Sequence, residues 1–153
     1  MQYNKLGFTD LTVSKLCFGS LTISPLQADL SIDDGAELIL YAMEMGVNFI
    51  DTAEFYRNYQ YINRAVKKAK GELIISSKSY AYTYEGMKES VEKARKEMDK
   101  DVVDIFMLHE QESRLTLKGH REALDYLVDA KAKGIIRAIG VSTHTVEVVN
   151  AAA

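Results

Sequence analysis

Four polar or ionisable residues each stand directly behind a short apolar segment of the chain. They are Asp51, Lys78, His109 and Ser142, and Tyr56 follows five residues after the first of them. A tyrosine has a pKa of about 10, which a neighbouring ammonium group lowers, and a carboxylate keeps that ammonium charged and oriented. A histidine can hydrogen-bond a carbonyl oxygen or relay a proton. These side chains could polarise and protonate a carbonyl group, and the hydride would have to come from a redox cofactor.

Each of these residues also has an ordinary structural explanation. Asp51 could cap a short turn, Lys78 could extend to solvent, and His109 could be a hydrogen-bonded structural histidine. Tyr56 is one of nine tyrosines. The combination is harder to explain this way, because a polar or ionisable residue follows each of several successive apolar segments. This recurrence favours a functional site.

The apolar segments alternate with helical patterns about every 30 residues, as βα units do. An opening hairpin is predicted at residues 2–6 and 11–15, with a turn between them. The strands do not alternate apolar and polar residues, which is typical of a parallel sheet. Such a pattern is compatible with a doubly wound sheet or with a barrel, and in both the carboxyl ends of the strands carry the site. The core strands are expected at 16–19, 47–50, 73–77, 102–108 and 135–141.

Helix boundaries are predicted from capping residues and glycines. Ser31 and Asp34 have the spacing of a capping pair before the first helix, and Gly46 follows its apolar stripe. The third helix has apolar residues every three or four positions from Met87 to Met98. The last helix is expected near Thr145, with Ser142 and Thr143 before it both capping the helix and binding a ligand.

The composition is that of a soluble globular protein, and residues 1–153 are expected to form one domain. The net charge of −3, without a basic block, argues against nucleic acid or an anionic membrane as a partner. The only cysteine, Cys17, lies in an apolar run and is expected in the core. No zinc-ligand spacing is present, so no metal site is predicted. Without a signal-like or membrane-spanning segment, a cytoplasmic location is expected.

The motifs resemble those of the aldo-keto reductase family over nearly the whole chain. The segment from Asp51 to Tyr56 is similar to the family's Asp-x4-Tyr after its second strand, and the segments ending at Lys78 and His109 are similar to the ends of its third and fourth strands. The opening segments and the stretch ending at Ser142 match its hairpin, first strand and fifth strand. The resemblance implies a (β/α)8 TIM-barrel fold, of which this chain holds the N-terminal β-hairpin and five βα units, an incomplete barrel.

The resemblance also implies a reaction, the NAD(P)H-dependent reduction of aldehydes or ketones to alcohols. Tyr56 would be the general acid, Lys78 paired with Asp51 would tune it, and His109 would orient a small-molecule carbonyl substrate. NADPH is favoured over NADH. The residues expected along the nicotinamide end of the cofactor are Gly19, Ser20, Leu21, Asp51, Ser142 and Thr143.

The chain departs from the family pattern at several places. Arg57 stands where glycine is common, and Thr143 with His144 replaces the usual asparagine after Ser142. A barrel of this type needs eight βα units in about 250 residues. We therefore expect open strand edges that promote self-association, weak cofactor binding and poor activity in the isolated chain. The specificity loops follow later strands, so the substrate is not predicted.

Three other functions fit some of the same residues. Lys78 could form a Schiff base in a lyase. His109, His144 and Asp51 could hold a metal ion in a hydrolase. The fold could instead serve a regulatory or binding protein without useful turnover, as in some relatives of the family.

Overall fold

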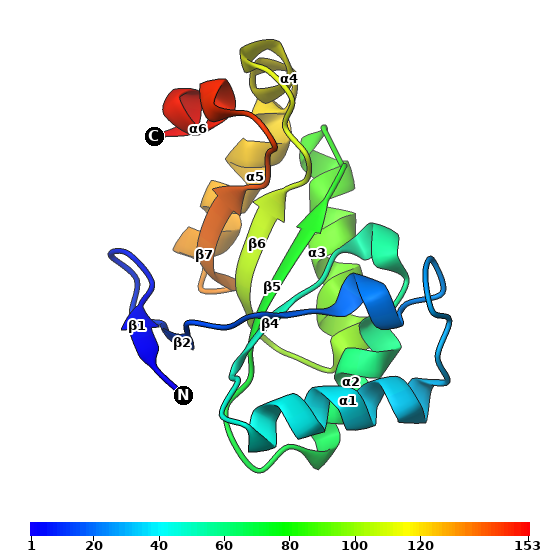
Figure 1. Ribbon diagram of the computed structural model, residues 1–153. Coiled ribbons are helices and arrows are strands. Elements are labelled where there is room, and N and C mark those ends of the chain that lie inside the picture. The colour runs from blue at the N-terminus through cyan, green and yellow to red at the C-terminus, as the bar shows by residue number, and fades with distance from the viewer.

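Five parallel strands form the central sheet of the protein, and they follow one another in the sheet in the same order as in the sequence (Figure 1). The computed structural model describes residues 1–153. A separate antiparallel hairpin precedes the sheet, as predicted. The hairpin strands are β1 (Tyr3–Lys5) and β2 (Thr12–Ser14), and the sheet strands are β3 (Phe18–Gly19), β4 (Phe49–Asp51), β5 (Ile74–Ser79), β6 (Val103–Leu108) and β7 (Ile136–Val141).

The long helices all cover the same face of this sheet (Figure 1). A doubly wound sheet would carry helices on both faces, so the one-sided cover indicates part of a (β/α)8 barrel. The short helix α4 was not predicted. The helices are η1 (Ser20–Ile23), α1 (Ile32–Glu44), η2 (Glu54–Tyr56), α2 (Tyr59–Lys68), α3 (Tyr84–Met98), α4 (Arg114–Gly119), α5 (Arg121–Ala132) and α6 (Val146–Ala152).

Side-chain caps begin most of the α-helices. Ser31 accepts a hydrogen bond from the backbone N–H of Asp34, which confirms the predicted cap of α1. Helix α6 differs from the prediction, because Thr145 caps it through the N–H of Val148 while Ser142 and Thr143 lie in the loop before it. A capping oxygen accepts a hydrogen bond from the backbone N–H two or three residues later in the chain. Thr145 stands three residues before Val148, whereas Ser142 and Thr143 are too far from the first turn.

The main core lies between the sheet and the helices. The predicted apolar face of α3 is fully buried in it, from Met87 to Met98. A smaller cluster lies on the opposite, concave face of the sheet, where Leu11 and Val13 of the hairpin segment pack against Ile105. The hairpin thus covers part of the face that no helix covers.

The hairpin is fixed by charge pairs at the N-terminal end of the strands. Arg137 at the start of β7 contacts Asp104 at 2.9 Å and Asp10 of the hairpin turn at 3.2 Å. Asp104 is buried and also accepts from Lys100 and from the N–H of Ile75. This leaves the carboxyl ends of the strands as the open end of the sheet.

Cys17 does not lie in the core, contrary to the prediction. It is exposed on the concave face, and Leu16 beside it is also exposed. Strand β3 covers only the last part of the predicted 16–19 segment. The apolar run suggested burial, but in this chain nothing packs over this part of the concave face. The nearby protein atoms still exclude part of the water around the thiol, and together with the negative charge of Asp51 this raises the pKa of Cys17 to about 12, so it is protonated at neutral pH.

Candidate active site

An ion pair between the buried Lys78 and the half-buried Asp51 joins the ends of β4 and β5. The Nζ atom of Lys78 donates to both carboxylate oxygens of Asp51 at 2.8 and 2.7 Å, and to the backbone oxygen of Thr52 at 2.9 Å. The Lys78 side chain is 6% exposed and that of Asp51 is 35% exposed. Burial of an ammonium group is costly unless it is paired and hydrogen-bonded. Here all three of its donors are satisfied, so the charge is held at a fixed place.

Tyr56 lies beside this pair at the end of η2. The Nζ atom of Lys78 lies 5.1 Å from the centroid of its ring. Burial, followed by the negative charges of Asp51 and Glu110, raises the pKa of Tyr56 above its usual value. The sequence prediction of a lowered pKa was wrong for this structure, because burial of the phenol has the largest effect and the carboxylates of Asp51 and Glu110 act in the same direction. Tyr56 is therefore a neutral phenol at physiological pH.

The turn that carries Tyr56 ends in a left-handed residue. Arg57 has φ 56° and ψ 34°, a conformation that favours glycine. This conformation explains why glycine is common at this position in the family that the motifs resemble. The arginine side chain is exposed, so the departure changes the backbone energy and the local charge without disturbing the packing.

His109 directly follows β6 and is 2% exposed. Burial, followed by the positive charge of Lys78, lowers its pKa to about 4, so the imidazole is neutral at physiological pH. Its ring centroid lies 5.8 Å from that of Tyr56. Its Nδ1 atom is buried without a hydrogen-bond partner. The structure thus brings Asp51, Tyr56, Lys78 and His109 together in one cluster.

An aromatic and acidic rim covers this cluster. The Tyr80 hydroxyl donates to the carboxylate of Glu110, whose backbone has φ 46°. His144 lies 3.7 Å from the other oxygen of Glu110. Glu110 was not among the residues predicted for the site. The signal in the sequence that could have identified Glu110 was its position directly after His109.

The residues predicted along a cofactor lie at two places on the same edge of the sheet. Gly19 pairs with Asp51 in the β3–β4 register, and the Ser20 hydroxyl donates to the backbone oxygen of Asp51 at 2.8 Å. Leu21 is half-buried in η1. At the other strand, the Ser142 hydroxyl accepts from the N–H of Glu110 at 3.0 Å. Thr143 accepts from the N–H of Thr145, so its hydroxyl is partly engaged in the loop.

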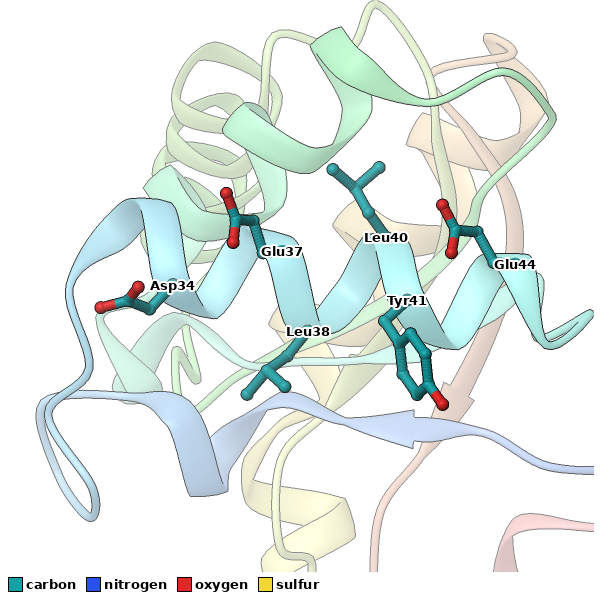
Figure 2. A pocket seen from close by; sticks show the side chains of 6 residues that line it. All are labelled: Asp34, Glu37, Leu38, Leu40, Tyr41 and Glu44. Atoms are coloured by element: carbon teal, nitrogen blue, oxygen red, sulfur yellow. The ribbon is translucent and has the colours of Figure 1, made fainter.

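Two depressions differ in their relation to this cluster. One, of about 620 Å³, lies on the concave face and includes Cys17, Asp51, Ser76 and Met107 in its lining. The other, of about 600 Å³, lies along the outer side of α1, away from these residues. Its lining includes the carboxylates of Asp34, Glu37 and Glu44 (Figure 2), and none of the residues predicted for the site lies there. The residues lining it are Asp34, Glu37, Leu38, Leu40, Tyr41 and Glu44.

No group of three or more His, Cys, Asp or Glu side chains is arranged to hold a metal ion. His109, His144 and Asp51, which the hydrolase hypothesis required, therefore do not form a ligand set. None of the helices has both the length and the apolar character needed to cross a bilayer.

Comparison with known proteins gives consistent matches along the chain. It is 30% identical over 124 residues to 2,5-diketo-D-gluconic acid reductase B of Corynebacterium sp. (strain SHS752001), which covers 74% of this chain and 42% of that protein. It is 27% identical over 148 residues to an Arabidopsis thaliana protein named as a probable voltage-gated potassium channel subunit beta, covering 84% of this chain and 43% of that protein. The chain thus spans less than half the length of these relatives.

The fold matches solved structures more completely. The thermostable aldo-keto reductase Tm1743, in complex with the inhibitor epalrestat, superposes with a TM-score of 0.82 and 28% identity, over 99% of this chain and 57% of that one. The protein is therefore an incomplete barrel of the same type. A family model described as the aldo/keto reductase family matches residues 15–153. On this evidence the chain belongs to the aldo/keto reductase family.

Proposed function

We propose that the chain carries the proton-transfer part of an NAD(P)H-dependent carbonyl reductase that converts aldehydes or ketones to alcohols. The observation that carries this proposal is the pair of the buried Lys78 with Asp51, beside the neutral phenol of Tyr56 and the neutral imidazole of His109. A proton donor, a fixed positive charge and a hydrogen-bonding imidazole are the groups that reduction of a carbonyl requires.

The roles follow from the charge states. His109 donates a hydrogen bond from its one N–H to the carbonyl oxygen and orients the substrate. Tyr56 transfers its phenolic proton to that oxygen as the carbon is reduced. Lys78 stabilises the phenolate that remains, and Asp51 holds Lys78 in place. A nicotinamide cofactor, when bound, supplies the hydride.

The residues proposed along the nicotinamide fit this role at β3. A Cβ atom added at Gly19 would meet no atom within 4 Å, so open space lies beside the strand end next to Asp51. Ser20 and Leu21 extend this edge, and Ser142 with Thr143 lies at the other side of the cluster. Of the two nicotinamide cofactors, we propose NADPH in preference to NADH. The chain spans less than half of its relatives, so we expect weak binding of either one and self-association through the uncovered concave face.

Replacement of the proton donor tests the proposal. With NADPH as reductant, methylglyoxal and 2,5-diketo-D-gluconic acid are suitable substrates, because they occur in the names of relatives 29% and 30% identical to this chain. We expect Tyr56→Phe to remove at least about 99% of the reduction, since a positioned proton donor contributes about 10²- to 10⁴-fold. NADPH affinity, followed by fluorescence, should change little. Reduction by the variant at near the original rate would contradict the assignment.

A regulatory or binding role is the second candidate. It is favoured by the similarity to the Arabidopsis protein named as a probable channel subunit. Retained NADPH binding without reduction of any carbonyl compound would support this role. The Schiff-base alternative is not favoured, because such a nucleophile must be a neutral amine, and the Nζ atom of Lys78 is paired with a carboxylate and donates three hydrogen bonds.

A further inference from the structure

Asn58 occupies the N-cap position of α2 but does not cap the helix. An asparagine at this position ordinarily accepts a hydrogen bond from a backbone N–H of the first turn. The Asn58 side chain makes no such bond, although it is completely buried. It lies two residues after Tyr56, separated from it only by the left-handed Arg57. A buried amide that gives up its capping bond is expected to be satisfied elsewhere.

Its partners lie at the ends of two strands. The Oδ1 atom of Asn58 accepts from the Thr52 hydroxyl at 2.7 Å. Its Nδ2 atom donates to the backbone oxygen of Ser20 at 2.8 Å and to the Ser20 hydroxyl at 3.0 Å. Ser20 and Thr52 are also completely buried. The amide therefore joins the residue after β3 to the residue after β4 in a fully hydrogen-bonded network.

The same network reaches the ion pair. The Ser20 hydroxyl donates to the backbone oxygen of Asp51, and the backbone oxygen of Thr52 accepts from the Nζ atom of Lys78 at 2.9 Å. Asn58 thus connects the ends of β3, β4 and β5 with the segment that holds Tyr56. Buried networks in which every member is satisfied make a local structure rigid.

We infer that Asn58 is a positioning residue, which holds the Tyr56 turn and Ser20 at fixed places relative to the Asp51–Lys78 pair. This inference rests on the proposed function, in which Tyr56 is the proton donor and Ser20 lies along the nicotinamide. Asn58 touches no reacting atom and acts only through these neighbours. Its loss displaces the turn, and displacements of about 1 Å can cost about 100-fold in rate.

The test compares two asparagines of the full chain. Asn58→Leu keeps the size of the side chain and removes all three hydrogen bonds. Asn63→Leu in α2 is the matched control, because the Nδ2 atom of Asn63 donates to the backbone oxygen of Glu97 at 2.8 Å, away from the cluster. If Asn58→Leu does not fold, Thr52→Val removes the donor to Oδ1 with almost no change in shape.

The principal measurement is the titration of Tyr56 by NMR, with tyrosines labelled at Cζ and the Tyr56 signal identified from Tyr56→Phe. This readout needs neither cofactor nor turnover. We expect Asn58→Leu and Thr52→Val to bring the pKa of Tyr56 back toward its usual value, since burial is the first cause of its elevation. We expect Asn63→Leu to leave it unchanged. Reduction with NADPH should fall about 10- to 100-fold in the first two variants.

An unchanged Tyr56 titration in Asn58→Leu and Thr52→Val, with a lowered melting temperature, would overturn the inference and leave Asn58 a purely stabilising role. The proposed function fails separately. If Tyr56→Phe retains reduction while Asn58→Leu still shifts the Tyr56 titration, the proton donor is assigned wrongly and the positioning role stands.

Discussion

The ring of Tyr80 stacks on the imidazole of His109, with centroids 4.2 Å apart and ring planes inclined by 21°. The hydroxyl of the same tyrosine is bound by Glu110, the residue that follows His109. Tyr80 is therefore fixed both by its ring and by its hydroxyl. This arrangement shields the imidazole from water and maintains its neutral form.

The pH dependence of stability should show this burial. The pKa of His109 is about 4 in the folded protein and about 6.5 when unfolded, so between these values the unfolded chain binds more protons. Stability should therefore rise with pH across this window and be complete above it. The loss on acidification amounts to about 3 kcal/mol at most. Urea unfolding of His109→Phe should lack this component, whereas His120→Gln should retain it. Parallel pH profiles for the native chain and His109→Phe would contradict the prediction.

Removal of the stacked ring should change the titration of His109 itself. In Tyr80→Ala the imidazole gains solvent, so its pKa should rise from about 4 toward its ordinary value near 6.5. The chemical shifts of the His109 ring protons during a pH titration measure this. Tyr82→Ala is the matched control, because Tyr82 contacts His120 edge-on at 6.4 Å. An unchanged His109 titration in Tyr80→Ala would show that the stack is not the source of the shift.

Loss of Asp51 should destabilise the fold because it leaves the buried Lys78 with fewer acceptors. The carboxylate is about one-third exposed, so we expect Asp51→Asn to lower the free energy of unfolding by about 2 kcal/mol. Asp125→Asn removes an exposed pair with Arg121 and should cost less than about 0.5 kcal/mol. Denaturant unfolding at neutral pH compares them. Equal losses would mean that Lys78 finds other partners.

The concave face should cause self-association of the chain. Its depression is lined mainly by apolar residues, including Phe8 at the hairpin tip, which is fully exposed. Phe8→Lys should lower the average mass measured by light scattering, since the new charges repel across an interface at this face. Leu115→Lys, at an exposed residue of α4, is the control. A native chain that stays monomeric at high concentration would disprove the prediction.

Much of the fold was predictable because local patterns and tertiary structure agree. The hairpin, the five parallel strands and the buried face of α3 were all expected from apolar periodicity, and the Ser31 cap from its spacing to Asp34. Cys17 was misplaced because apolar character predicts burial only where another element covers the residue. Helix α4 was missed because its six residues are too short to show a clear period.

The sequence was sufficient to group the residues of the candidate site, but it did not predict the direction of the pKa shift of Tyr56. Residues directly behind parallel strands meet at one edge, so Asp51, Lys78 and His109 could be grouped from the sequence. The direction of the Tyr56 pKa shift depends on burial and on the distances to the carboxylates of Asp51 and Glu110, which the spacing of residues in the sequence does not encode. The role of Asn58 depends on contacts with residues distant in the sequence, such as Ser20.

The identity of strand order and chain order has a consequence for biosynthesis. Strands β4, β5 and β6 are neighbours both in the sheet and in the sequence. Asp51, Lys78 and His109, at the ends of these strands, therefore come together without pairing between strands that are distant in the sequence. Contacts between segments close in sequence form early, and a growing polypeptide folds from its N-terminus. The cluster of Asp51, Lys78 and His109 can therefore assemble as the chain leaves the ribosome. The concave apolar face is uncovered during that interval, and transiently exposed apolar surface makes folding chains prone to aggregate.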